Sequence, residues 1–432
     1  GTLAAEPVSF RNDIAPLLLE HCASCHGPKK AEGGFRLDSF TQLSQAGDSG
    51  VAPLLVEGDH PSELVRRMTT DDAGERMPAE REALPPETVD LFKRWQSEGS
   101  KFDGDDPNAS IFDIVPDRTY PPSPQQYTVP IAITALALSS EGSQVIASGY
   151  HELTVWDATS GQMARRLPNM PERIYALDWS ADRKLLAVAG GSPGRIGEVR
   201  LVDWESGQVV KTVGRAADVI QTIRFQPGGQ LLATGNADGT VRWFDTRDWH
   251  LVRSLASHAD AVADIRWNKE GSRLASASRD KTAKVFNVES GELIATYSGH
   301  GEPVTGICFN DGDKEMTSVG GDRKAHRWQI DGNKALAKVD LAAAPTRLHV
   351  EGSSAWLALT DRTLRQLELA TTKLSRKLEG HAAWVTAVCT HPESNRLVSG
   401  ALNGEIRVWK LDDGTAVAKW IAAPGISEEN KL

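Results

Sequence analysis

Residues 265–297 read IRWNKEGSRLASASRDKTAKVFNVESGELIATY, and this stretch decides the fold of most of the chain. Four short segments with apolar residues alternate with polar turns at KEGS, RDKT and ESGE. Short segments of this kind, bounded by turn residues, are typical of β-strands joined in antiparallel hairpins. The stretch therefore predicts one antiparallel sheet of four strands.

The same pattern recurs between about residue 128 and about residue 425. A turn residue returns at intervals of 39 or 42 residues, and a bulky strand residue follows six positions after each. The five pairs are Asp238 with Phe244, Asp280 with Phe286, Asp322 with Trp328, Asp361 with Leu367 and Asn403 with Trp409. Two earlier copies, around Trp156 and Val202, bring the repeats to seven. Because a single four-stranded sheet cannot bury both of its faces, the period predicts a seven-bladed, all-β propeller.

This region resembles the WD-repeat family over about 300 residues. The resemblance rests on tripeptides of the VWD type, as at Trp156, and on a polar set that links strands through hydrogen bonds in that family. The fullest sets are His300, Ser318, Asp322, Trp328 and His381, Ser399, Asn403, Trp409; a third has His258, Ser276 and Asp280, with Phe286 in place of tryptophan. Since the set recurs at one offset, we interpret it as a device of the fold and not as a catalytic triad.

A different motif lies near the start, where residues 21–26 read HCASCH. Cys22, Cys25 and His26 form C-x-x-C-H, the attachment pattern of a c-type haem. Two thiols three residues apart add to the two vinyl groups of one haem, and the next histidine ligates its iron. We therefore predict thioether links at Cys22 and Cys25, with His26 as the proximal ligand. A redox dithiol or half of a zinc site is the alternative, but there is no second cysteine pair to complete a zinc site.

Two amphipathic helices are expected around this motif. Their apolar faces contain Phe10, Ile14, Leu17 and Leu18 before the motif, and Leu91, Phe92 and Trp95 in the stretch PPETVDLFKRWQSEG of residues 85–99. The spacing of three and four residues is that of one helix face. Pro85 and Pro86 mark the start of the second helix, and Gly99 marks its end. Two such helices crossing each other resemble the core of a class I cytochrome c.

Methionine is scarce in the first hundred residues, which narrows the search for a second iron ligand. Met77 lies in the loop sequence GERMPAE, followed by Pro78, whereas Met68 lies in the helical sequence SELVRRMTT. We favour Met77 as the distal ligand, because His/Met ligation is the electron-transfer pattern. Met68, His60 and an open site remain the alternatives, and His21 is expected to point away from the iron.

Residues from about 8 to 100 resemble the cytochrome c domain that is widespread in planctomycetes, where it is often fused to other domains, propellers included. The similar runs are VSFRNDIAPLLLEHCASCHGP, GGFRLDSFTQL, EGDHPSELVRRM, RMP and LFKRWQSEG. The resemblance implies that Cys22, Cys25 and His26 hold the haem, that Met77 is the family's ligating methionine, and that the role is electron transfer in the cell envelope. VAPLLVEGD departs from the more usual V-x-P-G, at a turn without ligands.

We expect three segments: 1–100 as an all-α class I cytochrome c domain, 101–127 as an extended Asp- and Pro-rich linker, and 128–432 as the propeller with the polar tail ISEENKL. Cys308 and Cys389 fall in strand-like stretches and are expected to be buried thiols. The chain begins with the small residues GTLAA, so we expect that an export leader is absent from this sequence. No apolar run is long enough to span a membrane.

The formal net charge of −10 argues against a nucleic-acid partner. The expected function is that of a periplasmic or cell-surface one-electron carrier with one covalent haem c, whose propeller docks a redox partner protein. Cytochrome c followed by a propeller is also the order in haem cd1 nitrite reductases, which have eight blades and a second cofactor. That enzyme, and a scaffold whose haem senses redox state or a gas, are the alternatives. The donor, acceptor, potential and oligomeric state do not follow from the sequence.

Overall fold

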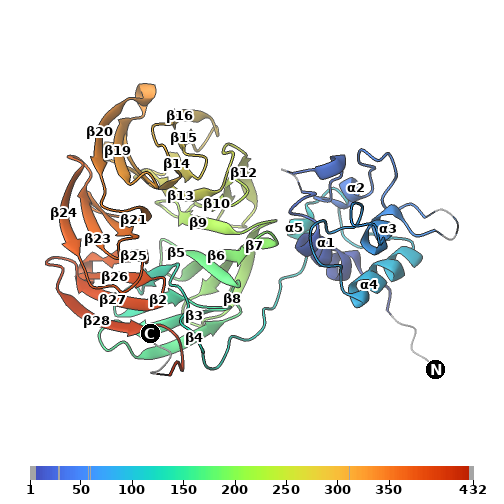
Figure 1. Cartoon of the computed structure of the whole chain (residues 1–432), viewed down its shortest axis with the longest axis horizontal. Coiled ribbons are helices and arrows are strands. Elements are labelled where there is room, and N and C mark those ends of the chain that lie inside the picture. The colour runs from blue at the N-terminus through green and yellow to red at the C-terminus, as the bar shows by residue number, and fades with distance from the viewer. Residues whose placement is uncertain (1–5, 28–29, 57, 59, 311, 428–432) are drawn as a thin grey trace. The chain divides into compact units, whose positions relative to one another are not determined.

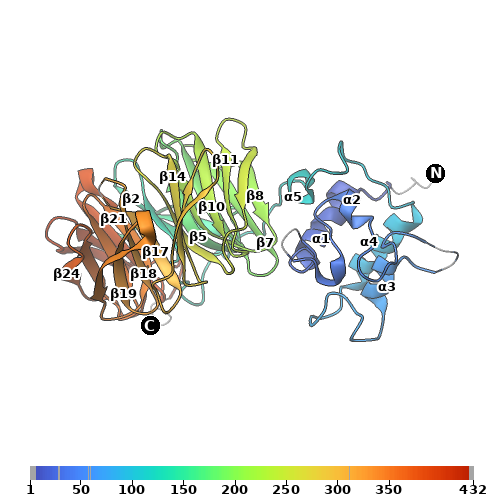
Figure 2. The same cartoon turned by 90° about the horizontal axis from the view of Figure 1, so that it is seen from above.

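A computed structural model describes residues 6–27, 30–56, 58, 60–310 and 312–427. The chain divides into two compact units. The first contains Gly1–Arg118 with the short segments Pro193–Ile196 and Arg215–Asp218, and the second contains the rest (Figures 1 and 2). The GTLAA start and the last five residues of the predicted polar tail lie outside the described residues.

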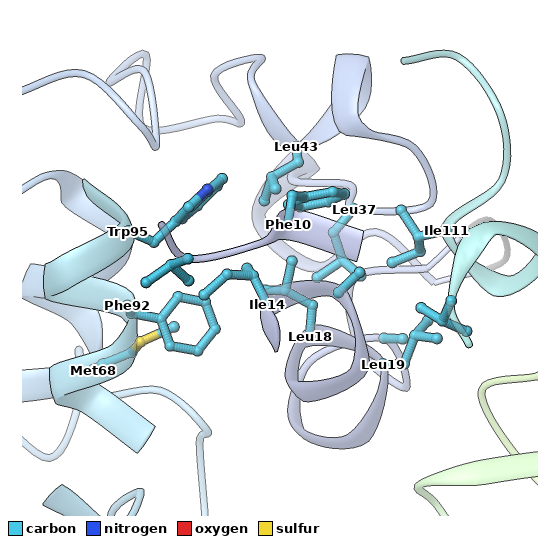
Figure 3. Close-up of a cluster of buried hydrophobic side chains, with 14 of the residues drawn as sticks. Phe10, Ile14, Leu18, Leu19, Leu37, Leu43, Met68, Phe92, Trp95 and Ile111 are labelled. Atoms are coloured by element: carbon cyan, nitrogen blue, oxygen red, sulfur yellow. The ribbon is translucent and has the colours of Figure 1, made fainter. Parts of the chain in front are cut away.

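The regular elements of the first unit are helices. They are η1 (Phe10–Ile14), α1 (Ala15–His21), η2 (Glu32–Gly34), α2 (Phe40–Leu43), α3 (Glu63–Thr69), α4 (Pro86–Ser97) and α5 (Ile111–Ile114). One cluster of buried apolar side chains from these helices forms the core (Figure 3). A small helical unit of this kind is compatible with a cytochrome domain.

The first predicted helix is present, although its first turn is a π-helix. The Ser9 hydroxyl caps η1 by accepting a hydrogen bond from the Asn12 backbone N–H at 2.9 Å. Helix α1 continues directly to the cysteine motif. Phe10, Ile14 and Leu18 are fully buried, so the predicted face is the buried one.

The second predicted helix, α4, begins at Pro86 and buries Phe92 and Trp95, as expected from its pattern. It ends at Ser97, and Gly99 adopts a φ of +93°, which glycine tolerates better than any other residue. The rings of Phe10 and Trp95 lie 5.6 Å apart between their centroids. The helix before the motif and the helix at the end of the unit therefore share one core (Figure 3).

Much of the stretch expected to be an extended linker is packed in the first unit instead. Residues 101–118 belong to that unit, and Ile111 is fully buried in its core. The Ser110 hydroxyl caps α5, and the Trp95 indole N–H donates to the Lys101 carbonyl at 3.0 Å. The Asp and Pro content of this stretch obscures the apolar sequence IFDIV, which supplies the buried residues.

The second unit is a propeller of seven antiparallel sheets, each built from four strands that follow one another in the sequence. The first blades are β1 (Leu136–Leu138), β2 (Gln144–Ser148), β3 (Glu152–Asp157), β4 (Met163–Pro168); β5 (Arg173–Trp179), β6 (Leu185–Ser192), β7 (Ile196–Asp203), β8 (Val209–Ala216); and β9 (Ile220–Phe225), β10 (Leu231–Asn236), β11 (Val241–Asp245), β12 (Leu251–Leu255). The fourth and fifth are β13 (Val262–Trp267), β14 (Arg273–Ser278), β15 (Ala283–Asn287), β16 (Leu293–Tyr297); and β17 (Val304–Phe309), β18 (Glu315–Gly320), β19 (Lys324–Gln329), β20 (Ala335–Asp340). The last two are β21 (Pro345–Glu351), β22 (Ser354–Leu359), β23 (Leu364–Glu368), β24 (Lys373–Leu378); and β25 (Val385–His391), β26 (Arg396–Ala401), β27 (Glu405–Lys410), β28 (Ala416–Ile421). The predicted seven blades are confirmed.

The polar sets act inside single blades, as the repeat predicted. His300 Nδ1 lies 3.0 Å from the Asp322 carboxylate, and His300 Nε2 lies 2.9 Å from Ser318 Oγ. The Trp328 indole donates to the same hydroxyl at 3.2 Å. The fourth blade repeats the histidine contacts with His258, Ser276 and Asp280. In both blades the histidine joins its loop to a strand and to the turn that follows that strand, which is a structural role.

The last blade departs from the predicted set. His381 and Trp409 both contact Ser399 Oγ, at 2.7 and 2.9 Å. Asn403, however, accepts a hydrogen bond from the Glu405 backbone N–H, and it is Glu405 whose carboxylate faces His381 at 3.8 Å. In this blade the acidic partner of the histidine is therefore Glu405 of β27, two residues after Asn403, whose amide is neutral.

Contacts between the first and last blades close the ring. The Thr386 hydroxyl donates to the Ile133 carbonyl at 2.6 Å, and the Ile133 N–H donates to the Ala401 carbonyl at 3.1 Å. Cys308 and Cys389 are buried, as expected, and all four cysteines of the chain are free thiols within its described part. In the described residues, no helix is long and apolar enough to cross a membrane.

Candidate functional site

The first unit contains a cavity of about 340 Å³ between the end of α1, helix α3 and the surrounding loops. Its walls are mostly apolar, with contributions from Phe35, Leu64 and Leu84. Cys22, His26, Met68 and Met77 also line it. A small, largely apolar cavity with a few polar groups is the usual form of a cofactor site.

His26 is held in place by the turn that follows α1. Its backbone N–H donates to the Cys22 carbonyl at 3.0 Å, and its carbonyl accepts from the Leu37 N–H at 2.9 Å. The imidazole packs edge-on against Phe35, with 5.2 Å between ring centroids. Burial lowers the pKa of His26, which favours the neutral imidazole that ligates metals. Its Nδ1 atom is buried and has no hydrogen-bond partner among the described residues.

The two cysteines lie in the same turn but in different surroundings. Cys22 directly follows α1 and lines the cavity, and burial raises the pKa of its thiol to about 12. Cys25, which is half-buried as Cys22 is, lies outside the lining residues. Its backbone N–H donates to the Cys22 carbonyl at 3.1 Å, so one turn of chain separates the two thiols.

Both candidate methionines reach the cavity, but from different elements. Met68 projects from α3, is 4% exposed, and lies beside Phe92 in the core (Figure 3). Met77 is half-buried in the loop between α3 and α4. Its peptide bond to Pro78 is cis, and Pro78 also lines the cavity. The packing of Met68 in the apolar core agrees with the structural role expected for it.

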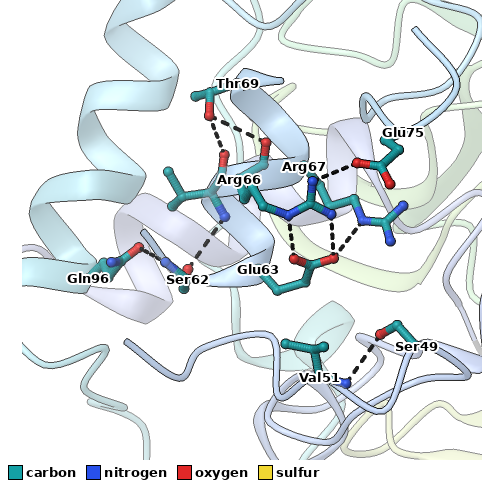
Figure 4. A network of polar contacts seen from close by, with 10 residues as sticks. Ser49, Val51, Ser62, Glu63, Arg66, Arg67, Thr69, Glu75 and Gln96 are labelled. Atoms are coloured by element: carbon teal, nitrogen blue, oxygen red, sulfur yellow. Dashed lines mark hydrogen bonds and ion pairs between the residues drawn. The ribbon is translucent and has the colours of Figure 1, made fainter. Parts of the chain in front are cut away.

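A charged network ties the Met77 loop to α3 (Figure 4). Glu63, in the first turn of α3, pairs with Arg66 and Arg67 at 2.6 and 2.7 Å. Arg66 also reaches Glu75 in the loop at 2.6 Å, and the Met77 N–H donates to the Arg67 carbonyl at 2.8 Å. Hydrogen bonding from Arg66 lowers the pKa of Glu63 to about 2. Two contacts therefore hold the loop against α3, one at Glu75 and one at Met77.

The structure does not bring every candidate to the cavity. His60 is exposed, and neither His60 nor His21 is among the described residues that line the cavity. Glu63 and Arg67 do line it, although sequence reasoning passed over them. Their i,i+4 spacing at the start of a helix was a visible sign of an ion pair, but not of its position at a cavity. Phe35 was also missed, because one phenylalanine after two glycines has no pattern.

The donor set fits a c-type haem. Within one turn the chain presents two thiols at the attachment spacing and a neutral imidazole, and a thioether lies across the same cavity. The neutral imidazole of His26 and the apolar walls match a ligating histidine in a water-poor pocket. A zinc site is disfavoured, because Cys22 and Cys25 have no further cysteine near them; the other two lie in β17 and β25.

Comparison with known proteins agrees with this geometry. Residues 22–80 match the family described as Planctomycete cytochrome C. Residues 207–245, 249–287, 291–329 and 372–410 match the WD domain, G-beta repeat. A search of curated proteins found no match. The resemblance to a planctomycete cytochrome c domain fused to a seven-bladed WD-repeat propeller is confirmed, and these parts suggest haem-based electron transfer and protein interaction.

Proposed function

We propose that this chain is an extracytoplasmic one-electron carrier that holds one covalent c-type haem in its first unit and docks a redox partner through its propeller. One observation carries the proposal: a single apolar cavity is lined by the thiol of Cys22, the imidazole of His26 and the thioether of Met77, which is distant from the other two in the sequence. A c-type haem with His/Met ligation supplies one-electron chemistry at a raised reduction potential.

The residues around the cavity then have separate tasks. Cys22 and Cys25 form the thioether links, and His26 supplies the proximal nitrogen, steadied by Phe35. Met77 supplies the distal sulfur from a loop that the Arg66–Glu75 pair holds against α3. Met68 is the alternative donor. The apolar side chains that complete the walls exclude water, which keeps the site in a low dielectric.

The compartment is part of the proposal. Covalent haem attachment takes place outside the cytoplasm, so a chain that uses Cys22 and Cys25 in this way has to be exported. Fractionation of cells that express the full gene should place the haem-stained protein in the periplasm or at the cell surface. Haem-stained protein confined to the cytoplasm would contradict this part of the proposal.

The propeller is proposed as the docking platform because a rigid ring of blades presents its loops to another protein. Seven blades, each of four strands, speak against the two-haem nitrite reductases, whose propellers have eight. Purification from a native membrane extract should recover a protein that exchanges electrons with the haem-loaded chain. An extract from which no electron-exchanging protein can be recovered would argue against docking.

The decisive test of the site is the optical spectrum of the oxidised and reduced protein with matched methionine variants. Met77→Ala is expected to abolish the weak red absorption band of Met–iron ligation and to allow rapid binding of carbon monoxide. Met68→Ala should keep that band while lowering stability, because it removes a core side chain. The opposite pattern would assign Met68, and a haemochrome count of two haems per chain would favour the reductase.

A further inference from the structure

The propeller contains a second cavity, of about 480 Å³, along its axis. The innermost strands of the blades surround this axis; Figure 1 shows β5, β9, β13, β21 and β25 around the centre of the ring. Three half-buried arginines line the cavity: Arg224 from β9, Arg266 from β13 and Arg347 from β21. Three cations from three blades in one small cavity need a physical explanation.

The fold itself does not require these arginines. In the register of each innermost strand with its neighbour, Arg224 pairs with Ala233 and Arg266 pairs with Ala275. The same register position holds Asp178 in β5, Cys308 in β17, His349 in β21 and Cys389 in β25. A position that accepts a thiol, a carboxylate or an imidazole in other blades is not a structural constant. Arg224 and Arg266 therefore differ from the repeated histidine–serine sets, and Arg347 comes from a different register position, paired with Ala358.

The strand edges satisfy only part of the hydrogen-bonding capacity of these side chains. Arg347 donates to the carbonyls of Thr134 and Tyr175, and Arg266 donates to the carbonyl of Leu348 at 2.7 Å. Arg224 donates to the adjacent Ile223 carbonyl. Each guanidinium has five N–H donors, and Arg266 Nε is buried without a partner among the described residues.

The charges around the cavity are also unbalanced. Asp178 is the only carboxylate among its described lining residues, and it accepts the Phe225 backbone N–H at 2.6 Å. Asp264, fully buried behind the arginines, lies 3.8 Å from Arg224 and 3.6 Å from Arg266. With Glu351, which accepts a hydrogen bond from the lining residue Thr390, three carboxylates stand against the three arginines and a fourth, exposed arginine, Arg183. Positive charge is therefore in excess.

The ionisation of the group facing these arginines agrees with that excess. Burial, together with the charges of Arg266 and Arg224, lowers the pKa of His349 to about 3, so it adds no charge at neutral pH. Burial and the neighbouring Arg266 lower the pKa of Arg224 to about 10. Because crowded, partly buried cations are unfavourable without a counter-charge, an anion in the cavity would stabilise the propeller.

We propose that the axial cavity of the propeller binds a small divalent oxyanion of the phosphate type, held by Arg224, Arg266 and Arg347. The guanidinium fork matches the oxygens of such a group in a bidentate manner, and three forks suit a dianion better than a monoanion. The exposed Arg183 lines the same cavity, so the cavity reaches solvent on that side. The site is independent of the haem.

Equilibrium dialysis of the full, haem-loaded chain against labelled inorganic phosphate tests the proposal, with chloride used to hold the ionic strength constant. One phosphate should bind per chain. Arg224→Gln and Arg266→Gln should each weaken binding about 10- to 100-fold, because each removes charge-assisted hydrogen bonds. Arg279→Gln is the matched control: Arg279 is an exposed arginine of the same blade as Arg266, and its loss should leave binding unchanged.

Thermal unfolding of the propeller provides a second measurement that does not depend on how much of a variant folds. Phosphate should raise the unfolding temperature of the unmodified protein and of Arg279→Gln, and at the same phosphate concentration it should raise that of Arg224→Gln much less. The absence of saturable binding, or equal binding in all variants, would overturn the proposal. Displacement of phosphate by an equal concentration of succinate would overturn the assignment to phosphate and indicate a dicarboxylate.

Discussion

In several blades of the propeller a buried histidine contacts a serine and an acidic residue at the same positions. In the first unit, by contrast, the turn that contains His26 has no second copy. The contacts of His258 and of His300 are nearly the same, at equivalent positions of neighbouring blades. His26, by contrast, shares its cavity with two methionines and Cys22, a combination without a second copy. Repetition thus identifies a structural feature of the fold, and a single occurrence points to chemistry.

The same criterion works inside the propeller. Arg224 and Arg266 stand where other blades carry a thiol or an imidazole, so they break the repeat at its axis. His326 of β19, the third strand of its blade, also departs from the repeat, because the aligned residue of the preceding blade is Lys284. Departures from a repeat are thus as informative as unique motifs. The comparison of the two units can be tested at the unique motif of the first unit and at the departures from the repeat in the propeller.

The largest expected effect is the loss of covalent haem. Replacing both Cys22 and Cys25 by serine removes both thioether links, so a haem stain of a denaturing gel should disappear completely. The control is the double substitution Cys308→Ser and Cys389→Ser, which alters the two buried propeller thiols and should keep the full stain. A Cys22/Cys25 variant that kept its covalent haem would show that the C-x-x-C-H motif of the first unit does not attach the haem.

The next effect is on stability, and it should stay within one unit. Phe92→Ala opens a cavity in the helical core and should lower that unit's free energy of unfolding by about 3 to 5 kcal/mol. Phe286→Ala removes an equally buried ring from the propeller and serves as its counterpart. Haem absorbance would report the first unit, and tryptophan fluorescence the propeller, since Trp95 is the only one of the 12 tryptophans before residue 118.

Denaturant unfolding with both probes makes the comparison. Each variant should shift only the transition of its own unit, because the buried clusters of the two units are built from different residues. A Phe92→Ala protein in which both transitions moved together would show that the two units unfold as one.

A smaller effect concerns pH and His326, which is 1% exposed and stacks on His300 with 3.9 Å between ring centroids. Burial lowers the pKa of His326 to about 4. Between its ordinary pKa of 6.5 and that value, the unfolded chain takes up a proton that the folded propeller does not. The propeller should therefore lose about 2 kcal/mol of stability from this group as the pH falls from about 7 to about 4.5.

The matched variants for this prediction are His326→Gln and His250→Gln. The first should flatten the pH dependence of the propeller's unfolding free energy, and the second, which alters an exposed histidine, should leave it as in the unmodified protein. Parallel pH profiles for the unmodified protein and His326→Gln would show that His326 takes up its proton at the same pH in the folded and unfolded chain.

The smallest effect tests the redundancy of the repeated sets. Trp328→Phe removes one indole N–H that donates to Ser318, but the fourth blade already carries Phe286 at the aligned position. We expect a loss of about 1 kcal/mol in thermal or denaturant unfolding, with an unchanged haem spectrum. A loss as large as that of Phe92→Ala would mean that the sets are not interchangeable between blades.

Much of the fold was predictable because its causes are local. The strands predicted around residue 280 agree with β13 to β16 to within a few residues, since turn residues and the 42-residue period lie in the sequence itself. The helix before the motif and helix α4, which begins at Pro86, were predicted in the same way from apolar spacing. The packing of Ile111 was not predicted, because its four-residue helix is too short to show a period.

The candidate site was predictable only in part. The proposed roles of Cys22, Cys25 and His26 follow from their spacing. Only the structure shows that Met68 and Met77 both line the cavity that these residues adjoin. The same holds for the ion pair of Glu63 and Arg67. Its helical spacing is visible in the sequence, but the position of these two residues beside Met77 is not.

The two architectures and the three residues of the C-x-x-C-H motif can be read from the sequence alone, because both depend on spacings of a few residues or on a repeated period. The tertiary structure alone decided which side chains share a cavity, that Glu405 and not Asn403 faces His381, and that arginines from three blades meet at the axis. These arrangements join residues that are tens to hundreds of positions apart. Only the packing of whole strands and helices brings such residues within contact distance.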